Sequence, residues 1–271
     1  MMSAMPELSR RALLRLGIGA AAGAAALRLS PPASAAPTYL DGSFVSAARG
    51  GATTNWAIAR PPGQGAPLRP IIALHGKGQD AAGVMAGGVE QGLAQAVAAG
   101  IPPVAVVAVD GGGSYWHKRA SGEDSGAMVL NELIPMLGDH GLDTSRVAFL
   151  GWSMGGYGAL LLGARLGAAR TAAITAVSPA LWTSSGAAAP GAFDGAGDYA
   201  ANSVWGLPAL NSIPIRIDCG NSDPFYSATK QFVAQLANPP SGGFSPGGHD
   251  GGYWSSQLPG EVGWMAPLLV A

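Results

Sequence analysis

R-V-A-F-L-G-W-S-M-G-G, residues Arg146–Gly156, runs from an apolar segment into a glycine-rich turn with Ser153 at its tip. The apolar residues predict a buried strand at Arg146–Leu150, and the following stretch, Tyr157–Leu166, predicts a helix. A strand, a sharp turn and a helix are the setting in which a serine hydroxyl is lifted clear of a sheet edge. The sequence therefore predicts that Ser153 is a nucleophile.

The G-x-S-x-G pattern around Ser153 carries little weight by itself. The chain has 42 glycines, so chance alone produces roughly half of one match, and a second match does occur at Gly243–Gly247. The surroundings separate the two, because the prolines and glycines around Ser245 predict a loop. At Ser153 the following helix begins beside the hydroxyl, so the N–H of Met154 could stabilise a developing oxyanion.

A serine nucleophile needs a base, usually histidine, and the chain has four histidines. We expect His249 to be the base because it lies C-terminal to the serine, in the loop G-G-H-D-G-G. His75 and Gly76 end a predicted strand, where loop N–H groups usually complete an oxyanion hole. His117 follows two aromatic residues in a loop, where it could line a substrate cleft or lie on the surface. His140 lies at the end of a predicted helix, where a capping role is the ordinary explanation.

The carboxylate that orients such a histidine should lie between Ser153 and His249, directly after a strand. Asp223 meets both conditions, since it lies in the turn after the predicted strand Ile213–Cys219. Asp218 is the rival, but a carboxylate within the strand would be buried rather than aimed at the sheet edge. Asp223 is therefore the expected acid.

Strands and helices alternate through the rest of the chain. Continuous apolar runs at Pro70–Leu74 and Val104–Val109 predict strands buried on both faces, hence a parallel sheet. Ser43–Arg60 predicts two strands that form an antiparallel edge. Further predictions are helices at Val84–Ala99, Ser125–Leu137, Tyr226–Leu236 and Tyr253–Leu269 (interrupted at Pro259-Gly260), a strand at Ala172–Val177 and a loop at Asn238–Gly248. We expect an α/β fold with a mostly parallel central sheet and helices on both faces.

An irregular insertion, Leu181–Ser212, precedes the strand that leads to Asp223. An insertion of this length in a compact domain is usually a functional loop or a lid. Its aromatic residues, together with Trp116, could line an apolar acyl pocket or belong to the core. His75, Trp116 and Trp152 are the candidate substrate-binding residues.

Residues 1–35 predict an export signal rather than a part of the fold. Arg10-Arg11 precedes the weakly apolar stretch Leu16–Leu27, and Ala33-Ser34-Ala35 supplies a small-residue cleavage pattern. This pattern is typical of twin-arginine export, so we expect a single mature domain, 36–271, that is secreted, periplasmic or associated with the cell envelope. A retained anchor is the alternative, although a spanning helix needs about 20 apolar residues.

Composition narrows the class of protein further. The full chain has 15 basic and 16 acidic side chains, and residues 1–35 contain four of the arginines and Glu7. The predicted mature domain therefore has 11 basic and 15 acidic side chains. This net negative charge disfavours nucleic-acid binding. Cys219 is the only cysteine, so no intramolecular disulfide can form. No H-E-x-x-H segment, carboxylate cluster or phosphate-binding loop is present in the sequence, and we expect no metal and no cofactor. The oligomeric state is left open.

Five segments carry a resemblance to a known family. They are L-H-G at Leu74–Gly76, E-L-I-P at Glu132–Pro135, G-W-S-M-G-G-Y-G-A-L at Gly151–Leu160, C-G-N-S-D-P at Cys219–Pro224 and G-G-H-D-G-G-Y-W at Gly247–Trp254. Together they resemble the esterases that include esterase D, S-formylglutathione hydrolases and the mycobacterial mycolyltransferases, all with the α/β-hydrolase fold. The resemblance covers most of the predicted mature domain.

The resemblance implies Ser153 as nucleophile, Asp223 as acid and His249 as base, with Met154 and the loop at Gly76 as the oxyanion site. Two residues depart from the family pattern. Trp152 stands where a small or aliphatic residue is usual, and Gly251 stands where a tryptophan often follows the His-Asp pair. Substrate specificity therefore does not carry over from the family.

We accordingly expect an exported serine esterase that hydrolyses carboxylic esters, of small molecules or lipids, through an acyl-enzyme. An acyltransferase is the alternative, because a sugar or glycerol hydroxyl can intercept the same acyl-enzyme and accept an acyl or mycolyl group. A non-catalytic binding module on a hydrolase scaffold is a third interpretation. Its usual signature, loss of the serine or the histidine, is absent here.

Overall fold

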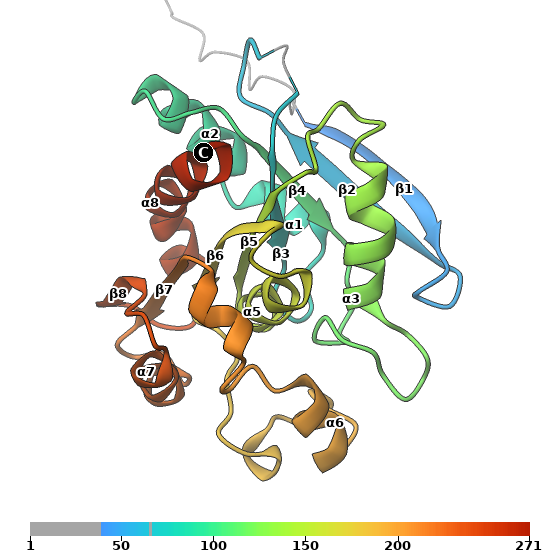
Figure 1. Cartoon of the computed structure of the whole chain (residues 1–271), viewed down its shortest axis with the longest axis vertical. Helices are drawn as coiled ribbons and strands as arrows, with labels where there is room; N and C mark the ends of the chain where they lie inside the picture. Colours follow the sequence, from blue (N-terminus) through green and yellow to red (C-terminus); the bar gives the residue numbers. More distant parts are fainter. Residues whose placement is uncertain (1–38, 65–66) are drawn as a thin grey trace, which may run out of the picture. The chain divides into compact units, whose positions relative to one another are not determined.

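A twisted central sheet organises the protein in a computed structural model that describes residues 39–64 and 67–271 (Figure 1). Over these residues the sheet has eight strands in the order β1-β2-β4-β3-β5-β6-β7-β8. The strands β1 and β2 join antiparallel, β2 also joins β4 antiparallel, and the remaining neighbours are parallel. The strands are β1 (Leu40–Ser46), β2 (Ala52–Ala59), β3 (Pro70–Leu74), β4 (Ala105–Val109), β5 (Val147–Trp152), β6 (Thr171–Val177), β7 (Ile215–Gly220) and β8 (Ser241–Ser245).

Helices cover both faces of this sheet, because alternate residues of the buried strands point to opposite sides. Ala73 and Leu150 face α1, α2 and α8, whereas Leu74 and Phe149 face the layer built from α3, η1, α4, α5 and α7. The helices are α1 (Ala81–Ala86), α2 (Val89–Ala98), α3 (Ser125–Ala127), the π-helical η1 (Met128–Leu133), α4 (Ile134–Met136), α5 (Met154–Leu166), α6 (Ala196–Asn202), α7 (Tyr226–Gln235) and α8 (Gly251–Val270). The predicted α/β architecture, mostly parallel with two helical layers, is confirmed.

The predicted insertion between β6 and β7 is present and mostly irregular. Its regular parts are short, namely α6 and the 3₁₀ turns η2 (Ser185–Ala187) and η3 (Pro208–Ser212). The predicted signal segment, residues 1–35, lies outside the described residues. Within the described ranges, no helix is both long and apolar enough to cross a membrane.

Three predicted elements differ from the structure for identifiable physical reasons. The helix predicted at Val84–Ala99 is two helices, since Gly88 adopts a left-handed φ of 95° and separates α1 from α2. The loop predicted at Asn238–Gly248 contains β8, an edge strand with mostly exposed residues, so it lacks an apolar pattern. The break predicted at Pro259-Gly260 does not occur, because α8 keeps a buried stripe that includes Leu258 and Val262 on either side.

Candidate active site

Ser153 lies at the turn between β5 and α5, and its backbone conformation is strained. Its φ of 56° and ψ of −120° are unusual for any residue other than glycine. The turn is held on both sides, since the Ser153 N–H donates to the Val177 carbonyl at 3.0 Å and the Ser153 carbonyl accepts from the Ala180 N–H at 2.9 Å. The strand, turn and helix predicted around Ser153 are thus present, with the hydroxyl at the carboxyl end of the parallel strands.

The structure brings the three predicted triad residues into one hydrogen-bonded chain. His249 Nε2 lies 2.9 Å from Ser153 Oγ, and His249 Nδ1 lies 2.8 Å from Asp223 Oδ2. Both distances are those of good hydrogen bonds. The Asp223 side chain is fully buried, whereas the His249 side chain is 23% exposed. The imidazole that would accept the Ser153 proton is therefore still accessible to solvent.

Asp223 is held as a carboxylate by its surroundings. Burial by itself would raise its pKa, but hydrogen bonds from His249 and the Phe225 N–H, together with the nearby Ser178 hydroxyl, outweigh burial, and the pKa lies below its ordinary value. The Phe225 N–H donates to Oδ1 at 2.8 Å, which leaves Oδ2 for the imidazole. An ionised Asp223 fixes the tautomer in which His249 Nδ1 carries the proton and Nε2 can accept one.

The rival carboxylates have other partners. Asp218 pairs with Arg216, with Oδ2 2.6 Å from Nε. Asp250, beside His249, caps α8 by accepting from the Tyr253 N–H at 3.0 Å. Neither carboxylate is hydrogen-bonded to the imidazole, so the chain-order argument and the geometry select the same residue, Asp223.

The two predicted oxyanion donors differ in their surroundings. Met154 is the first residue of α5, and N–H groups in a first helical turn have no partner within the helix. The Gly76 N–H instead donates to Gln79 Oε1 at 3.1 Å, and the same oxygen accepts from Trp152 Nε1 at 2.6 Å. Gly76 therefore does not offer a free donor in this structure. No motif in the sequence singles out Gln79 as its partner.

His75 and Trp116, predicted as substrate-binding residues, are both fully buried. His75 Nε2 accepts from the Gly111 N–H at 2.9 Å, so Nδ1 carries the proton and donates to the Gly76 carbonyl at 2.8 Å. Burial lowers the pKa of His75, in keeping with a neutral imidazole. The Trp116 ring packs 5.0 Å from His75 and fills the space beside Gly158. Neither side chain lies on a surface that a substrate could reach, so the expectation is corrected to a supporting role beneath the site.

The aromatic residues of the insertion pack on one another and on aromatic residues of the rest of the domain. Phe193 contacts the rings of Tyr115, His117, Tyr157, Trp182 and Tyr199. The cavity left among this group is only about 10 Å³, about enough for a single water molecule. These residues therefore extend the hydrophobic core and do not form an open acyl pocket.

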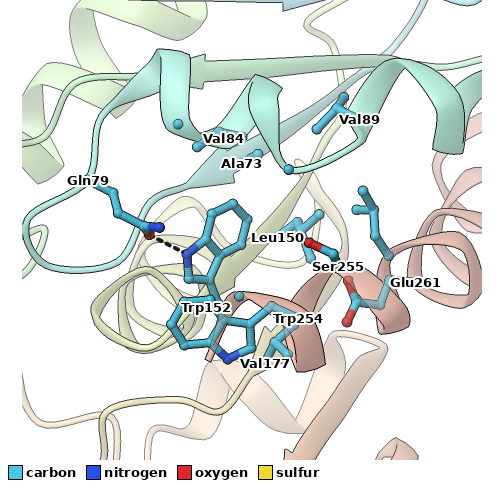
Figure 2. Close-up of a pocket in the computed structure, with 14 residues that line it drawn as sticks. Ala73, Gln79, Val84, Val89, Leu150, Trp152, Val177, Trp254, Ser255 and Glu261 are labelled. Carbon is cyan, nitrogen blue, oxygen red and sulfur yellow. Dashed lines mark hydrogen bonds between the residues drawn. The ribbon is translucent and has the colours of Figure 1, made fainter. Parts of the chain in front are cut away.

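A larger apolar pocket is lined by Trp152, the residue before the nucleophile, and by Trp254 (Figure 2). Its volume is about 70 Å³. The two tryptophan rings stack at 6.0 Å with an angle of 24°, and the Trp254 ring meets the His249 ring edge-on at 5.2 Å. Trp152 was a candidate substrate-binding residue, and it does line this pocket. The sequence gave no signal for the pocket itself, because its walls come from distant segments.

Glu261 of α8 also lines this pocket, and the fold opposes its ionisation. Burial, followed by the nearby charge of Asp218, raises its pKa well above the ordinary value of 4.5, although Arg216 acts in the opposite direction. The folded protein therefore holds this proton more tightly than the unfolded chain does. Consequently the free energy of unfolding falls as the pH rises above 4.5 towards the raised folded pKa.

Substitution Glu261→Gln should remove this loss of stability, since an amide of nearly the same shape has no charge to bury. We expect the Tm values of the two proteins to be closest near pH 4.5 and the variant to gain with rising pH, by roughly 2–4 °C for each kcal/mol relieved. Thermal unfolding followed by circular dichroism across the acidic and neutral range measures this. A Tm difference that stays constant over that range would contradict the expectation.

Metal ligation has no candidate in the described part of the chain. Residues 39–64 and 67–271 contain no group of three or more His, Cys, Asp or Glu side chains placed to hold an ion.

Comparisons with known proteins bear on the family and the fold. The family model described as "Putative esterase" matches residues 50–265, most of the chain. A search of curated proteins finds no match. Among solved structures, the chain is similar to a ferulic acid esterase, at 20% identity and a TM-score of 0.73, covering 85% of this chain and 97% of that one.

Two further solved structures are similar to the chain. S-formylglutathione hydrolase FrmB from Staphylococcus aureus is 19% identical, with a TM-score of 0.70 over 84% of this chain and 98% of that one. MPT51 from Mycobacterium tuberculosis is 18% identical, with a TM-score of 0.68 over 86% of this chain and 100% of that one. At such identities the likeness concerns the fold, and the expected α/β-hydrolase fold is confirmed. The chain belongs to the "Putative esterase" family and is a serine hydrolase that acts on carboxylic esters.

Proposed function

We propose that the protein is an exported esterase that uses Ser153, His249 and Asp223 as its catalytic triad. The observation that carries the proposal is the unbroken chain of hydrogen bonds from Ser153 Oγ through His249 to the buried Asp223 carboxylate. Such a chain activates a hydroxyl that is otherwise a weak nucleophile at neutral pH.

Acylation begins when Ser153 Oγ attacks the ester carbonyl carbon and its proton moves to His249 Nε2. Asp223 accepts the Nδ1–H hydrogen bond and stabilises the imidazolium that forms. The carbonyl oxygen becomes an oxyanion near the start of α5, where the Met154 N–H and the helix dipole favour negative charge. The intermediate then collapses: the ester C–O bond breaks, the imidazolium protonates the leaving alcohol, and the acyl group stays on Ser153.

Deacylation repeats these steps with water as the nucleophile. His249, 23% exposed at its side chain, takes a proton from water while the hydroxide oxygen bonds to the acyl carbon. Collapse of the second intermediate breaks the bond to Ser153 Oγ, and His249 returns its proton to that oxygen. The carboxylic acid is released and the triad is restored.

Covalent labelling is the direct test of this proposal. A fluorophosphonate probe should modify the folded protein once, at Ser153, and the same preparation should hydrolyse 4-nitrophenyl acetate. Intact-protein and peptide mass spectrometry locate the label, and the Ser153→Ala variant is the control. Labelling at another residue, or equal hydrolysis by wild-type protein and variant, would refute the assignment.

Acyl transfer is the second candidate, because His249 is partly exposed and could activate an alcohol in place of water at the acyl-enzyme. Incubation with an acyl donor and either trehalose or a diacylglycerol separates the two reactions. A transfer product that forms faster than free acid supports transferase activity, and free acid alone supports hydrolysis.

Export is proposed from the twin arginines and the small-residue cleavage pattern within residues 1–35. The mass and N-terminal sequence of protein recovered outside the cytoplasm test it. A chain that begins at Ala36 is the expected product, and protein found only in the cytoplasm would contradict the proposal.

A further inference from the structure

The pocket behind Trp152 and Trp254 lies directly beside the triad. Trp152 precedes the nucleophile in the chain, and the Trp254 ring lies 5.2 Å from the His249 ring. Gln79 holds Trp152 in place through the 2.6 Å hydrogen bond to its Nε1. The two tryptophan rings thus line the pocket next to residues of the triad, and the Trp152 ring is held by Gln79, as Figure 2 shows.

The size and lining of the pocket restrict what it can hold. Its 70 Å³ leaves room for about five non-hydrogen atoms, if one water needs roughly 10–15 Å³ on this measure. Apolar side chains make most of the wall, including Val84, Leu150, Val177 and Leu258. None of the residues that line it is Lys, Arg or His. A carboxylate or phosphate would therefore meet no opposite charge, so the lining favours an uncharged group.

Glu261 is the one ionisable residue on this mostly apolar wall, where Gln79 and Ser255 are also polar. The residue is 2% exposed, and Oε1 has no hydrogen-bond partner within the described residues. The nearby cation, Arg216, is already paired with Asp218. Buried polar groups in folded proteins nearly always have a partner, so an orphaned oxygen in a pocket wall needs an explanation.

The protonation state of Glu261 defines the partner it can take. Burial raises the pKa of Glu261 and so favours the neutral carboxylic acid, which can donate one hydrogen bond as well as accept. A hydroxyl or keto oxygen on a short chain would accept that proton. A plain alkyl chain would fit the apolar wall but would leave the carboxyl unpartnered.

We propose that this pocket is a substrate subsite that takes one arm of the ester, a short uncharged chain whose hydroxyl or keto oxygen hydrogen-bonds to Glu261. The inference rests on the proposed esterase function, and it adds a substrate class to that function. Glu261 acts here as a specificity residue and takes no part in bond breaking.

Paired substrates of equal length test the proposal. The acyl arm is tested with 4-nitrophenyl pentanoate and 4-nitrophenyl 4-oxopentanoate, and the alcohol arm with pentyl acetate and 4-oxopentyl acetate followed by acid release. In one of the two series, Glu261→Leu should lower kcat/KM for the oxo ester about five- to tenfold, the worth of one hydrogen bond. We expect the loss in KM, with the plain ester changed less than about twofold.

Glu261→Gln is the matched control, because its amide can still donate to a keto oxygen. It should keep most of the preference for the oxo ester. Losses of equal size for oxo and plain esters in both series, or no loss in either, would overturn the proposal.

A binding measurement separates failure of the subsite from failure of the esterase assignment. Trp152 and Trp254 line the pocket, so their fluorescence should change saturably when Ser153→Ala protein is titrated with 4-oxopentanamide. The change should weaken in the Ser153→Ala, Glu261→Leu double variant. Binding without hydrolysis by the wild-type protein would keep the subsite and reject the esterase. Hydrolysis by the wild-type protein, without binding of 4-oxopentanamide and without an effect of Glu261→Leu, would keep the esterase and reject the subsite.

Discussion

Replacement of Ser153 by alanine should lower kcat for ester hydrolysis by about 10⁶-fold, and replacement of His249 by alanine should have a similar effect. The two losses should not add in the double variant, because either change removes the same unit, a serine made nucleophilic by the imidazole 2.9 Å from its oxygen. Single-turnover rates with an activated ester give each value. A double variant far slower than both single variants would show that the two residues do not act together.

The neighbouring aspartates supply the control for this prediction. Asp223→Asn should lower kcat by about 10⁴-fold, because an amide cannot hold His249 in the reactive tautomer. Asp250→Asn should leave kcat within a few-fold, since this carboxylate caps α8 and asparagine caps helices equally well. If the second substitution were the costlier one, the acid would be Asp250 and the hydrogen bond from Nδ1 to Asp223 would be incidental.

The substitution Gly155→Ala should destabilise the protein by more than about 4 kcal/mol or prevent it from folding. An added Cβ would overlap the backbone carbonyl of Leu74 and crowd that of His75, and a strand backbone in the middle of the sheet cannot give way. The absence of a side chain two positions after the nucleophile is therefore needed so that α5 can approach β3. Urea unfolding of the purified variant, or its yield of soluble protein, measures the effect.

Gly263→Ala is the control for this second prediction. Gly263 is also helical, but nothing lies within 4 Å of the Cβ it would gain. This change should raise stability by about 0.5–1 kcal/mol, because alanine loses less conformational freedom in a helix. Equal behaviour of the two variants would contradict the packing argument at Gly155.

Sequence reasoning worked best where structure is set by neighbouring residues. The strand Pro70–Leu74 has the predicted bounds, and the turn at Ser153 lies between a strand and a helix as expected. Continuous apolar runs and a glycine-rich turn are local signals, so they can be recognised without knowledge of the fold. The proximity of Ser153, Asp223 and His249 could also be predicted, because the carboxyl ends of parallel strands meet at one edge of the sheet.

Features that depend on distant contacts were not readable. The strand β8 has the sequence S-G-G-F-S and is a strand only because its backbone pairs with β7. His75 and Trp116 looked like cleft residues, yet packing against Gly111 and Gly158 buries them. The pocket near Trp152 joins segments almost 200 positions apart in the chain, which no pattern in the sequence connects.

Gln79 has a consequence for how this enzyme could be redesigned or could diverge. One amide oxygen serves both the Gly76 N–H and the Trp152 indole. A substitution at position 79 would therefore alter two features together. It would change the position of the Gly76 loop, the predicted oxyanion loop, and the position of the Trp152 ring in the pocket wall. On the α8 side of that pocket, Trp254 contacts the His249 ring, but Leu258 and Glu261 do not share the Gln79 hydrogen bonds. New substrate preferences could therefore accumulate at these two positions with less damage to turnover.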